Sequence, residues 1–152
     1  MAKFNYRLQN ILNLMENFEE QAKQAFAERR KILSDEEDKL AALNMRAEEL
    51  EAESARLRNG ELDIRHIMEN EYEQKYNKEE IKKQKLKVKV AQKNLENARA
   101  RMEDAVKERK IHEKLKDNAF ETFMSEEAAA ESLEVDQLTS YVYGAKKADQ
   151  ES

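Results

Sequence analysis

The sequence contains no proline and only two glycines in 152 residues. These two residue types most often interrupt helices, so their scarcity permits helices many turns long. Charged residues make up 40% of the chain, and the 39% that is hydrophobic is rich in alanine. Such a composition is typical of long helices and coiled coils, with disorder as the alternative for so charged a chain. The spacing of the apolar residues decides between the two.

Apolar residues recur at alternating intervals of four and three near the start of the chain. This 3.5-residue period predicts a stripe that packs on a partner helix in a left-handed coiled coil. Arg29 interrupts the stripe and Ile32 resumes it. The stripe occupies Phe4, Leu8, Ile11, Met15, Phe18, Ala22 and Ala25.

Further along, Leu43, Leu50, Leu57 and Ile64 keep this register, but their companion positions change. A coiled-coil stripe needs a second apolar position between successive members of this series. The earlier register puts that position at Lys39 and Arg46, but the apolar residues stand one place later, at Leu40 and Ala47. We therefore expect the packing to loosen locally at that shift.

Asn59-Gly60 is the strongest turn signal in the interior, and glycine commonly ends helices. The sequence therefore predicts an all-α fold in which two long helices form an antiparallel coiled-coil hairpin. One domain covers residues 1–152, with a first arm of about residues 3–58, a turn at 59–61, a second arm at 62–142 and a frayed tail at 143–152. The second arm carries its own apolar stripe, at Val88, Ala91, Leu95, Ala98, Met102 and Ala105.

Folding the chain back at residue 60 places residue i beside residue 120 − i. This rule predicts that Phe18 meets Met102 and that Phe4 lies near Lys116. The longer second arm then extends past the first, and its apolar residues there have no partner. These residues are Phe120, Phe123, Met124, Leu133, Val135, Leu138, Tyr141 and Val142.

The chain shows no sign of secretion or membrane insertion. Cysteine is absent, which excludes disulfides and thiol chemistry and suits a reducing cytosol. The first residues lack the apolar core of a signal peptide, and no apolar run approaches the roughly 20 residues of a membrane span. We expect a cytoplasmic protein with no transmembrane segment.

Charge is distributed unevenly along the chain, whose net charge is −5. The stretch from Lys75 to Lys93 holds eight lysines, whereas that from Asp117 to Asp136 holds seven acids and no Lys or Arg. The lysine stretch is either a solvated face or a nucleic-acid contact. We favour the solvated face, because only two tyrosines nearby are able to stack on bases, and expect no nucleic-acid partner.

The sequence offers little for catalysis or metal binding. Asp63 precedes His66 by three residues, but a helical carboxylate–histidine site needs matching ligands on two facing helices. The other histidine, His112, follows Arg109 instead, so a solvated His66 is the better interpretation. Two isolated glycines cannot form a phosphate-binding loop. We expect no catalytic residue, no metal site and no cofactor, and hence no enzyme.

Two features are unusual for a plain coiled coil. The second stripe turns polar at Arg109, His112 and Lys116, which indicates either a weak, fraying end or a surface meant for a partner. Tyr72 and Tyr76 form an i, i+4 aromatic pair near the turn, which either packs at the hairpin tip or forms an exposed docking patch.

Several segments, in order, resemble the flagellar type III export protein FliJ family. They are Phe4-x-Tyr6-Arg7-Leu8-Gln9-x-Ile11-Leu12-x-Leu14, then Tyr72 and Tyr76 followed by Ile81-x-x-Gln84, then the run from Ala105 to Lys116, and finally Asp136-Gln137-Leu138. The resemblance covers nearly the whole chain. His112 departs from it, since that family usually carries an aliphatic residue there.

The resemblance implies a hairpin similar to the central stalk of rotary ATPases. It implies a peripheral protein at the cytoplasmic face of the membrane at the flagellar base, where it links the hexameric export ATPase to the membrane export gate and escorts export chaperones. The ATPase-binding residues would be Arg7, Gln9, Lys107, Arg109, Lys110 and Lys114. The gate-binding residues would be Leu43, Leu50, Tyr72 and Tyr76.

Two other functions remain open from the sequence alone. One is the stalk of an injectisome secretion system, which differs little in sequence pattern. The other is a general coiled-coil scaffold or holdase, which would bind unfolded clients and have no effect on an ATPase.

Overall fold

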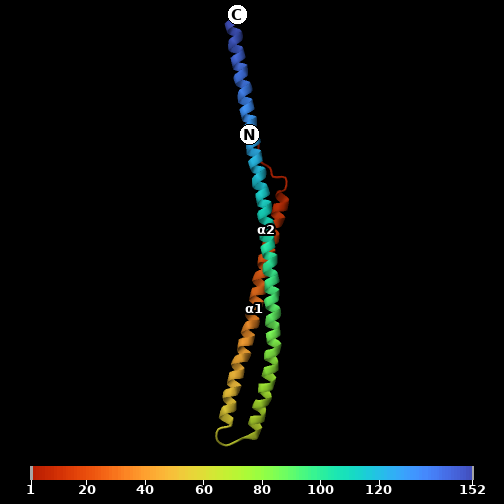
Figure 1. Cartoon of the computed structure of the whole chain (residues 1–152), viewed down its shortest axis with the longest axis vertical. Helices are drawn as coiled ribbons and strands as arrows, with labels where there is room; N and C mark the ends of the chain where they lie inside the picture. Colours follow the sequence, from red (N-terminus) through yellow and green to blue (C-terminus); the bar gives the residue numbers. More distant parts are fainter. Residues whose placement is uncertain (1, 152) are drawn as a thin grey trace. The chain divides into compact units, whose positions relative to one another are not determined.

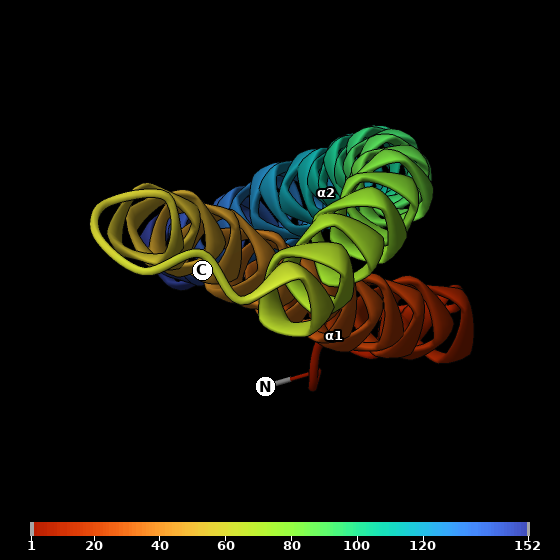
Figure 2. The same ribbon diagram turned by 90° about the horizontal axis from the view of Figure 1, so that it is seen from below.

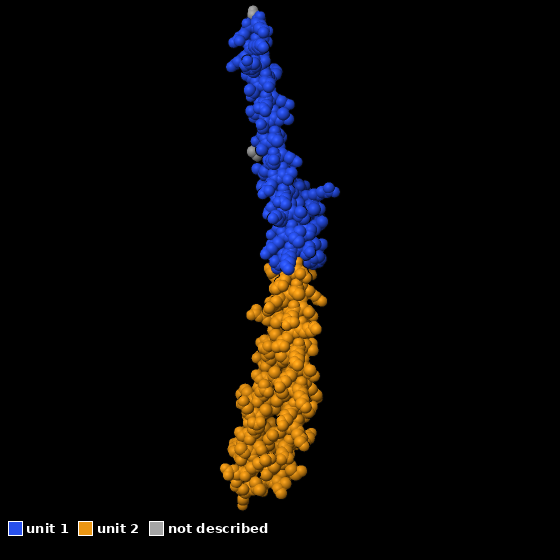
Figure 3. All heavy atoms as spheres, viewed as in Figure 1, with its two compact units in different colours: residues 1–18, 106–152 blue, residues 19–105 orange. Residues whose placement is uncertain are grey.

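The computed structural model describes residues 2–151, and this part of the chain contains two helices and no strand. Helix α1 spans Gln9–Leu57 and helix α2 spans Ile64–Glu151 (Figure 1). The predicted all-helical hairpin of two long helices packed on each other is confirmed. The chain divides into two compact units, and the single domain over residues 1–152 stays a prediction. Unit 1 comprises Met1–Phe18 with Val106–Ser152, and unit 2 comprises Glu19–Ala105 (Figure 3).

The turn of unit 2 lies where Asn59-Gly60 predicts it. Gly60 has a φ of 102°, a left-handed conformation that glycine adopts without the steric cost of a Cβ atom. Asp63 then caps α2, because its carboxylate accepts a hydrogen bond of 3.1 Å from the backbone N–H of Arg65. Figure 2 looks along the helices from this end and shows the connection passing from α1 to α2.

In unit 2 the helices pack through a stripe of positions on each, which we call the seam. On α2 the buried and half-buried residues recur every three or four positions, as a coiled coil requires. The predicted positions from Val88 to Ala105 all belong to it, and Val88, Ala91 and Ala98 are fully buried. The seam also continues toward the turn through Asn70, Gln74, Asn77, Ile81 and Gln84.

Three of these polar residues are buried. In each, the side-chain amide N–H donates a hydrogen bond to a backbone carbonyl oxygen of α1. Each pair obeys the rule that residue i faces residue 120 − i, so the predicted register is observed in unit 2. The donor and acceptor residues are Asn70 and Leu50 at 3.0 Å, Asn77 and Leu43 at 3.1 Å, and Gln84 and Glu36 at 2.9 Å.

The predicted seam of α1 was wrong in half of its positions. Met15 and Ala22 are half-buried as expected, but Ile11, Phe18 and Ile32 are exposed by 38%, 47% and 36%. The series that contains Leu40 and Ala47 continues toward the start of α1 at seven-residue intervals. The expected change of register, and the looser packing expected with it, are therefore absent from the described part of α1. The earlier members of the series are Leu33, Phe26, Glu19 and Leu12, all buried or half-buried. Phe18 therefore lies outside the seam and does not play the core role assigned to it.

Unit 1 contains an aromatic cluster that the register rule misplaced. The Phe4 ring lies 5.2 Å from Phe120 and 5.3 Å from Phe123, measured between centroids, about one turn beyond the predicted neighbour Lys116. Residues 2–8 precede α1. A non-helical segment covers more length per residue than the 1.5 Å rise of a helix, which accounts for the longer reach.

From Ala128 to Glu151, every residue of α2 is exposed. The predicted second arm ended at residue 142, but the helix continues through Gly144 to Glu151. Most of the expected frayed tail is thus helical, while Ser152 lies outside the described residues.

Candidate protein-binding surfaces

The described residues, 2–151, contain no group of three or more His, Asp or Glu side chains arranged to hold a metal ion. His66 and Asp63 hydrogen-bond to each other, and both side chains are more than half exposed. This hydrogen bond from His66 lowers the pKa of the Asp63 carboxyl below its usual value. In the same part of the chain, neither helix has an apolar stretch long enough to cross a membrane.

The predicted ATPase-binding residues all belong to unit 1. Lys107, Lys110 and Lys114 are exposed and lie on one face of α2, because positions i, i+3 and i+7 share a face. Within residues 2–151, no ion pair neutralises any of these three lysines. Ile111, exposed by 55%, lies between them in sequence. The three lysines and Ile111 form a cationic surface with an apolar component, which we call the lysine face.

The other predicted residues of this group differ in accessibility. Arg7 is exposed, whereas Gln9 is half-buried and donates a hydrogen bond of 2.9 Å to the side chain of Asn13. The Arg109 side chain is 22% exposed and forms an ion pair of 2.8 Å with Glu113. Arg109 is therefore held within unit 1 and presents less charge to a partner than the three lysines do.

The polar break in the second stripe lies within the packed part of unit 1. Arg109, His112 and Lys116 are half-buried, and α2 remains helical through all three. Within the described chain, the Nδ1 atom of His112 and the hydroxyl of Tyr6 are buried without a hydrogen-bond partner.

Tyr72 and Tyr76 are exposed by 73% and 62% in unit 2. Both lie off the seam, whose nearest positions are Asn70, Gln74 and Asn77. Large aromatic side chains that leave so much surface in water favour the docking patch over packing at the hairpin tip.

Leu43 and Leu50, the other two predicted gate-binding residues, are seam residues. Leu50 is only 1% exposed, Leu43 is half-buried, and their backbone carbonyls accept the amide hydrogen bonds of Asn77 and Asn70. Their side chains stabilise the hairpin and are not available to a partner while it is closed. Both residues were correctly predicted to lie in the stripe that packs on the partner helix, and this burial makes them unsuited to docking.

A groove on one side of unit 2 was not predicted. It has a volume of about 340 Å³ and is lined by Ile32 and Glu36 from α1 and by Leu86, Lys87, Val90, Ala91 and Asn94 from α2. Leu86 and Val90 are exposed by 63% and 60%. Their spacing of four residues, away from the seam, is the sequence signal that identifies this second apolar strip.

Comparison with solved structures shows a related fold. A protein from Chlamydia trachomatis, described as a YscO homologue, superposes with a TM-score of 0.76 at 19% sequence identity. The match covers 95% of this chain and 98% of that one. No curated protein matches the sequence.

The family comparison extends over almost the entire sequence. Residues 4–148 match the model of the flagellar FliJ protein. This match includes unit 2 and nearly all of unit 1, and it agrees with the hairpin described above. The members of this family are non-enzymatic components of flagellar protein export. The chain belongs to the flagellar FliJ protein family.

Proposed function

We propose that the protein is a stalk and adaptor of the flagellar type III export apparatus. In this role it binds the hexameric export ATPase through unit 1 and the membrane export gate through unit 2, and it hydrolyses nothing itself. It works in the cytoplasm, peripherally at the inner face of the membrane at the flagellar base. Escort of export chaperones is part of the same proposal.

The observation that carries the ATPase contact is the lysine face. Lys107, Lys110 and Lys114 have no counter-ion within the described residues, so their charge is available for carboxylates that line the pore of a ring. Exposed ion pairs are individually weak and are screened by salt. Several together still bias the assembly of a ring, since about 1.4 kcal/mol changes an equilibrium constant tenfold. Binding the assembled hexamer better than its subunits stabilises the hexamer by mass action.

The decisive measurement is ATP turnover by the export ATPase with and without this protein, at low and high salt. We expect stimulation that falls as salt rises and is lost when Lys107, Lys110 and Lys114 are changed to Glu. Lys75, Lys78 and Lys82 have the same spacing and are also exposed, so their change to Glu is the matched control. No stimulation by the unmodified protein, together with binding to unfolded clients, would support the general holdase instead.

The gate contact rests on Tyr72 and Tyr76. Changing both to Ala should impair motility and export while leaving the melting temperature nearly unchanged, because neither side chain belongs to the seam. Met45, which is 63% exposed on α1, supplies a control through Met45→Ala. A large loss of helicity in the double variant would show that the tyrosines pack at the tip and would contradict a docking role.

A further inference from the structure

The groove of unit 2 has the features of a binding site for another helix. Ile32, Leu86 and Val90 line it and expose 36%, 63% and 60% of their surfaces. Neighbouring apolar groups left in water on an otherwise highly charged surface are typical of a protein-binding site. An amphipathic helix that inserts its apolar side chains into such a groove is a common mode of recognition.

The charge along the α2 side of the groove selects an acidic occupant. Lys83, Lys87 and Lys93 belong to the lysine stretch that includes Leu86 and Val90. Glu80 pairs with Lys83 at 3.6 Å and compensates only part of this charge. The groove's own acid, Glu36, accepts a hydrogen bond from Gln84, which lowers the pKa of that carboxyl, and the charges of Lys39 and Lys87 act in the same direction. Lys83, Lys87 and Lys93 outnumber the carboxylates of Glu80 and Glu36, so a net positive charge remains beside the apolar strip.

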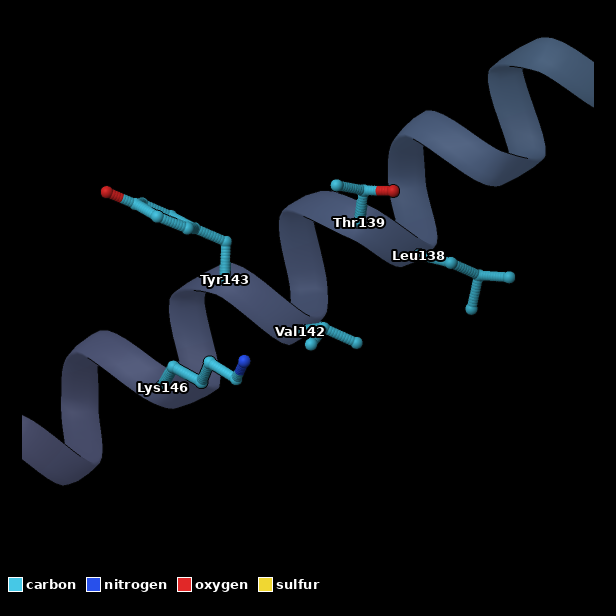
Figure 4. A pocket seen from close by; sticks show the side chains of 5 residues that line it. All are labelled: Leu138, Thr139, Val142, Tyr143 and Lys146. Carbon is cyan, nitrogen blue, oxygen red and sulfur yellow. The ribbon is translucent and has the colours of Figure 1, made fainter.

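The C-terminal part of α2 has the complementary chemistry. Val135, Leu138 and Val142 follow at i, i+3 and i+7, so they share one side of the helix, and they are exposed by 58%, 60% and 52%. Figure 4 shows Leu138 and Val142 projecting to the same side of α2. No Lys or Arg occurs between residues 117 and 145. The acids of this segment are Glu126, Glu127, Glu131, Glu134 and Asp136.

We propose that the groove of unit 2 in one molecule binds residues 126–142 of a second copy of this protein. The segment supplies an apolar stripe to cover the exposed Leu86 and Val90, and negative charge to pair with the lysines beside them. Most of the groove lining and the whole segment belong to the same helix, α2. A helix does not pack against itself, so the occupant comes from another molecule. The contact buries one helix face in one groove, a small interface, and is therefore reversible and dependent on protein concentration.

The absence of cysteine allows a direct test with the full-length protein. One preparation carries Val90→Cys, and the other carries Val135→Cys, Leu138→Cys or Val142→Cys, so that all registers of the stripe are sampled. After mixing and mild oxidation, we expect a disulfide-linked heterodimer in at least one combination. Gln92→Cys is the matched control, because Gln92 lies with Leu33 and Leu95 at a different surface depression of unit 2. Its yield should be several-fold lower.

The charge component has its own test. Lys83→Glu with Lys93→Glu in the Val90→Cys chain should reduce cross-linking, and Glu131→Lys with Glu134→Lys in the other chain should restore it. Raising salt from about 0.1 M to about 1 M shortens the screening length from roughly 10 Å to roughly 3 Å, so the yield of the unmodified pair should fall. The melting temperature of each variant confirms that the hairpin is intact.

Sedimentation equilibrium provides an independent readout for the cysteine-free protein. We expect the average mass to rise with concentration at low salt and to fall back when Leu138→Lys is introduced. A protein that stays monomeric at all concentrations, with equal cross-linking at Val90→Cys and Gln92→Cys, would overturn the proposal. Because neither measurement involves an ATPase, this outcome would leave the stalk function untouched.

Discussion

The side-chain amide of Asn77 donates a hydrogen bond of 3.1 Å to the backbone carbonyl oxygen of Leu43 across the hairpin of unit 2. Asn77 is only 6% exposed. The carbonyl of Leu43 keeps its second lone pair for the helix, so the bond adds to the backbone ladder of α1 without breaking it. Asn70 and Gln84 repeat the arrangement seven residues to either side.

Asn77→Asp should destabilise the hairpin by about 3 kcal/mol or more, because a buried carboxylate would face a carbonyl oxygen without a donor. Lowering the pH protonates the introduced carboxyl, turns it into a donor and should recover part of the loss. Urea denaturation monitored by circular dichroism at pH 7 and pH 4 measures both effects. Equal stability of the variant and the parent protein at pH 7 would mean that Asn77 is solvated.

Leu12 and Phe18 distinguish the observed seam of α1 from the one predicted. Leu12 is 3% exposed, whereas Phe18 is 47% exposed. Leu12→Ala should cost about 2–4 kcal/mol in the free energy of unfolding, as buried leucines do. Phe18→Ala should cost about 1 kcal/mol or less, since surface changes have small effects. The reverse order of the two values in thermal or urea unfolding would restore the predicted stripe.

The two glycines should respond in opposite directions to the same substitution. A Cβ atom would meet nothing within 4 Å at either Gly60 or Gly144, so space does not distinguish them. Gly60→Ala should destabilise the hairpin by about 1–2 kcal/mol, because the backbone of Gly60 has a left-handed conformation that a Cβ atom disfavours. Gly144→Ala should increase helicity, because alanine is favoured over glycine in a helix by about 1 kcal/mol. Melting temperature and helical ellipticity test the pair.

The ionised Glu36 carboxylate should make the hairpin sensitive to acid. The hydrogen bond from Gln84 lowers the pKa of Glu36 in the folded state below its unfolded value. Its contribution is therefore present above the unfolded pKa of about 4.3 and is lost as the pH falls through the lower folded value. The melting temperature of the parent protein should fall more steeply below about pH 4.3 than that of Glu36→Gln. Parallel pH profiles would show that Gln84 does not favour the charged form.

The second stripe was predictable because all six of its residues from Val88 to Ala105 are apolar or small, and the pattern allows one interpretation. The first stripe was ambiguous, since apolar residues occur at two adjacent sets of positions. Glu19 made the true set look polar, although its side chain is buried and pairs with Lys23 at 2.9 Å. Hydrophobic periodicity cannot recognise a seam position filled by a polar residue whose bonds are satisfied.

The same limit explains the missed amides. Asn70, Asn77 and Gln84 lie seven residues apart and in line with Ala91 and Ala98, a spacing visible in the sequence, but their burial depends on acceptors in α1. Among the candidate site residues, the exposure of Tyr72 and Tyr76 followed from their positions off the seam. The groove beside Leu86 and Val90 depended on how two helices meet, which a pattern along one helix does not contain.

The three amide bonds also give the hairpin an order of assembly. The chain separating donor from acceptor lengthens from 20 residues for Asn70 to 34 for Asn77 and 48 for Gln84. Closing a longer loop costs more entropy, although the increase is only logarithmic, and each bond formed nearer the turn shortens the loop left for the next. The two helices of unit 2 should therefore pair progressively from Gly60 outward. Each amide hydrogen bond fixes the register before the next pair of residues comes into contact.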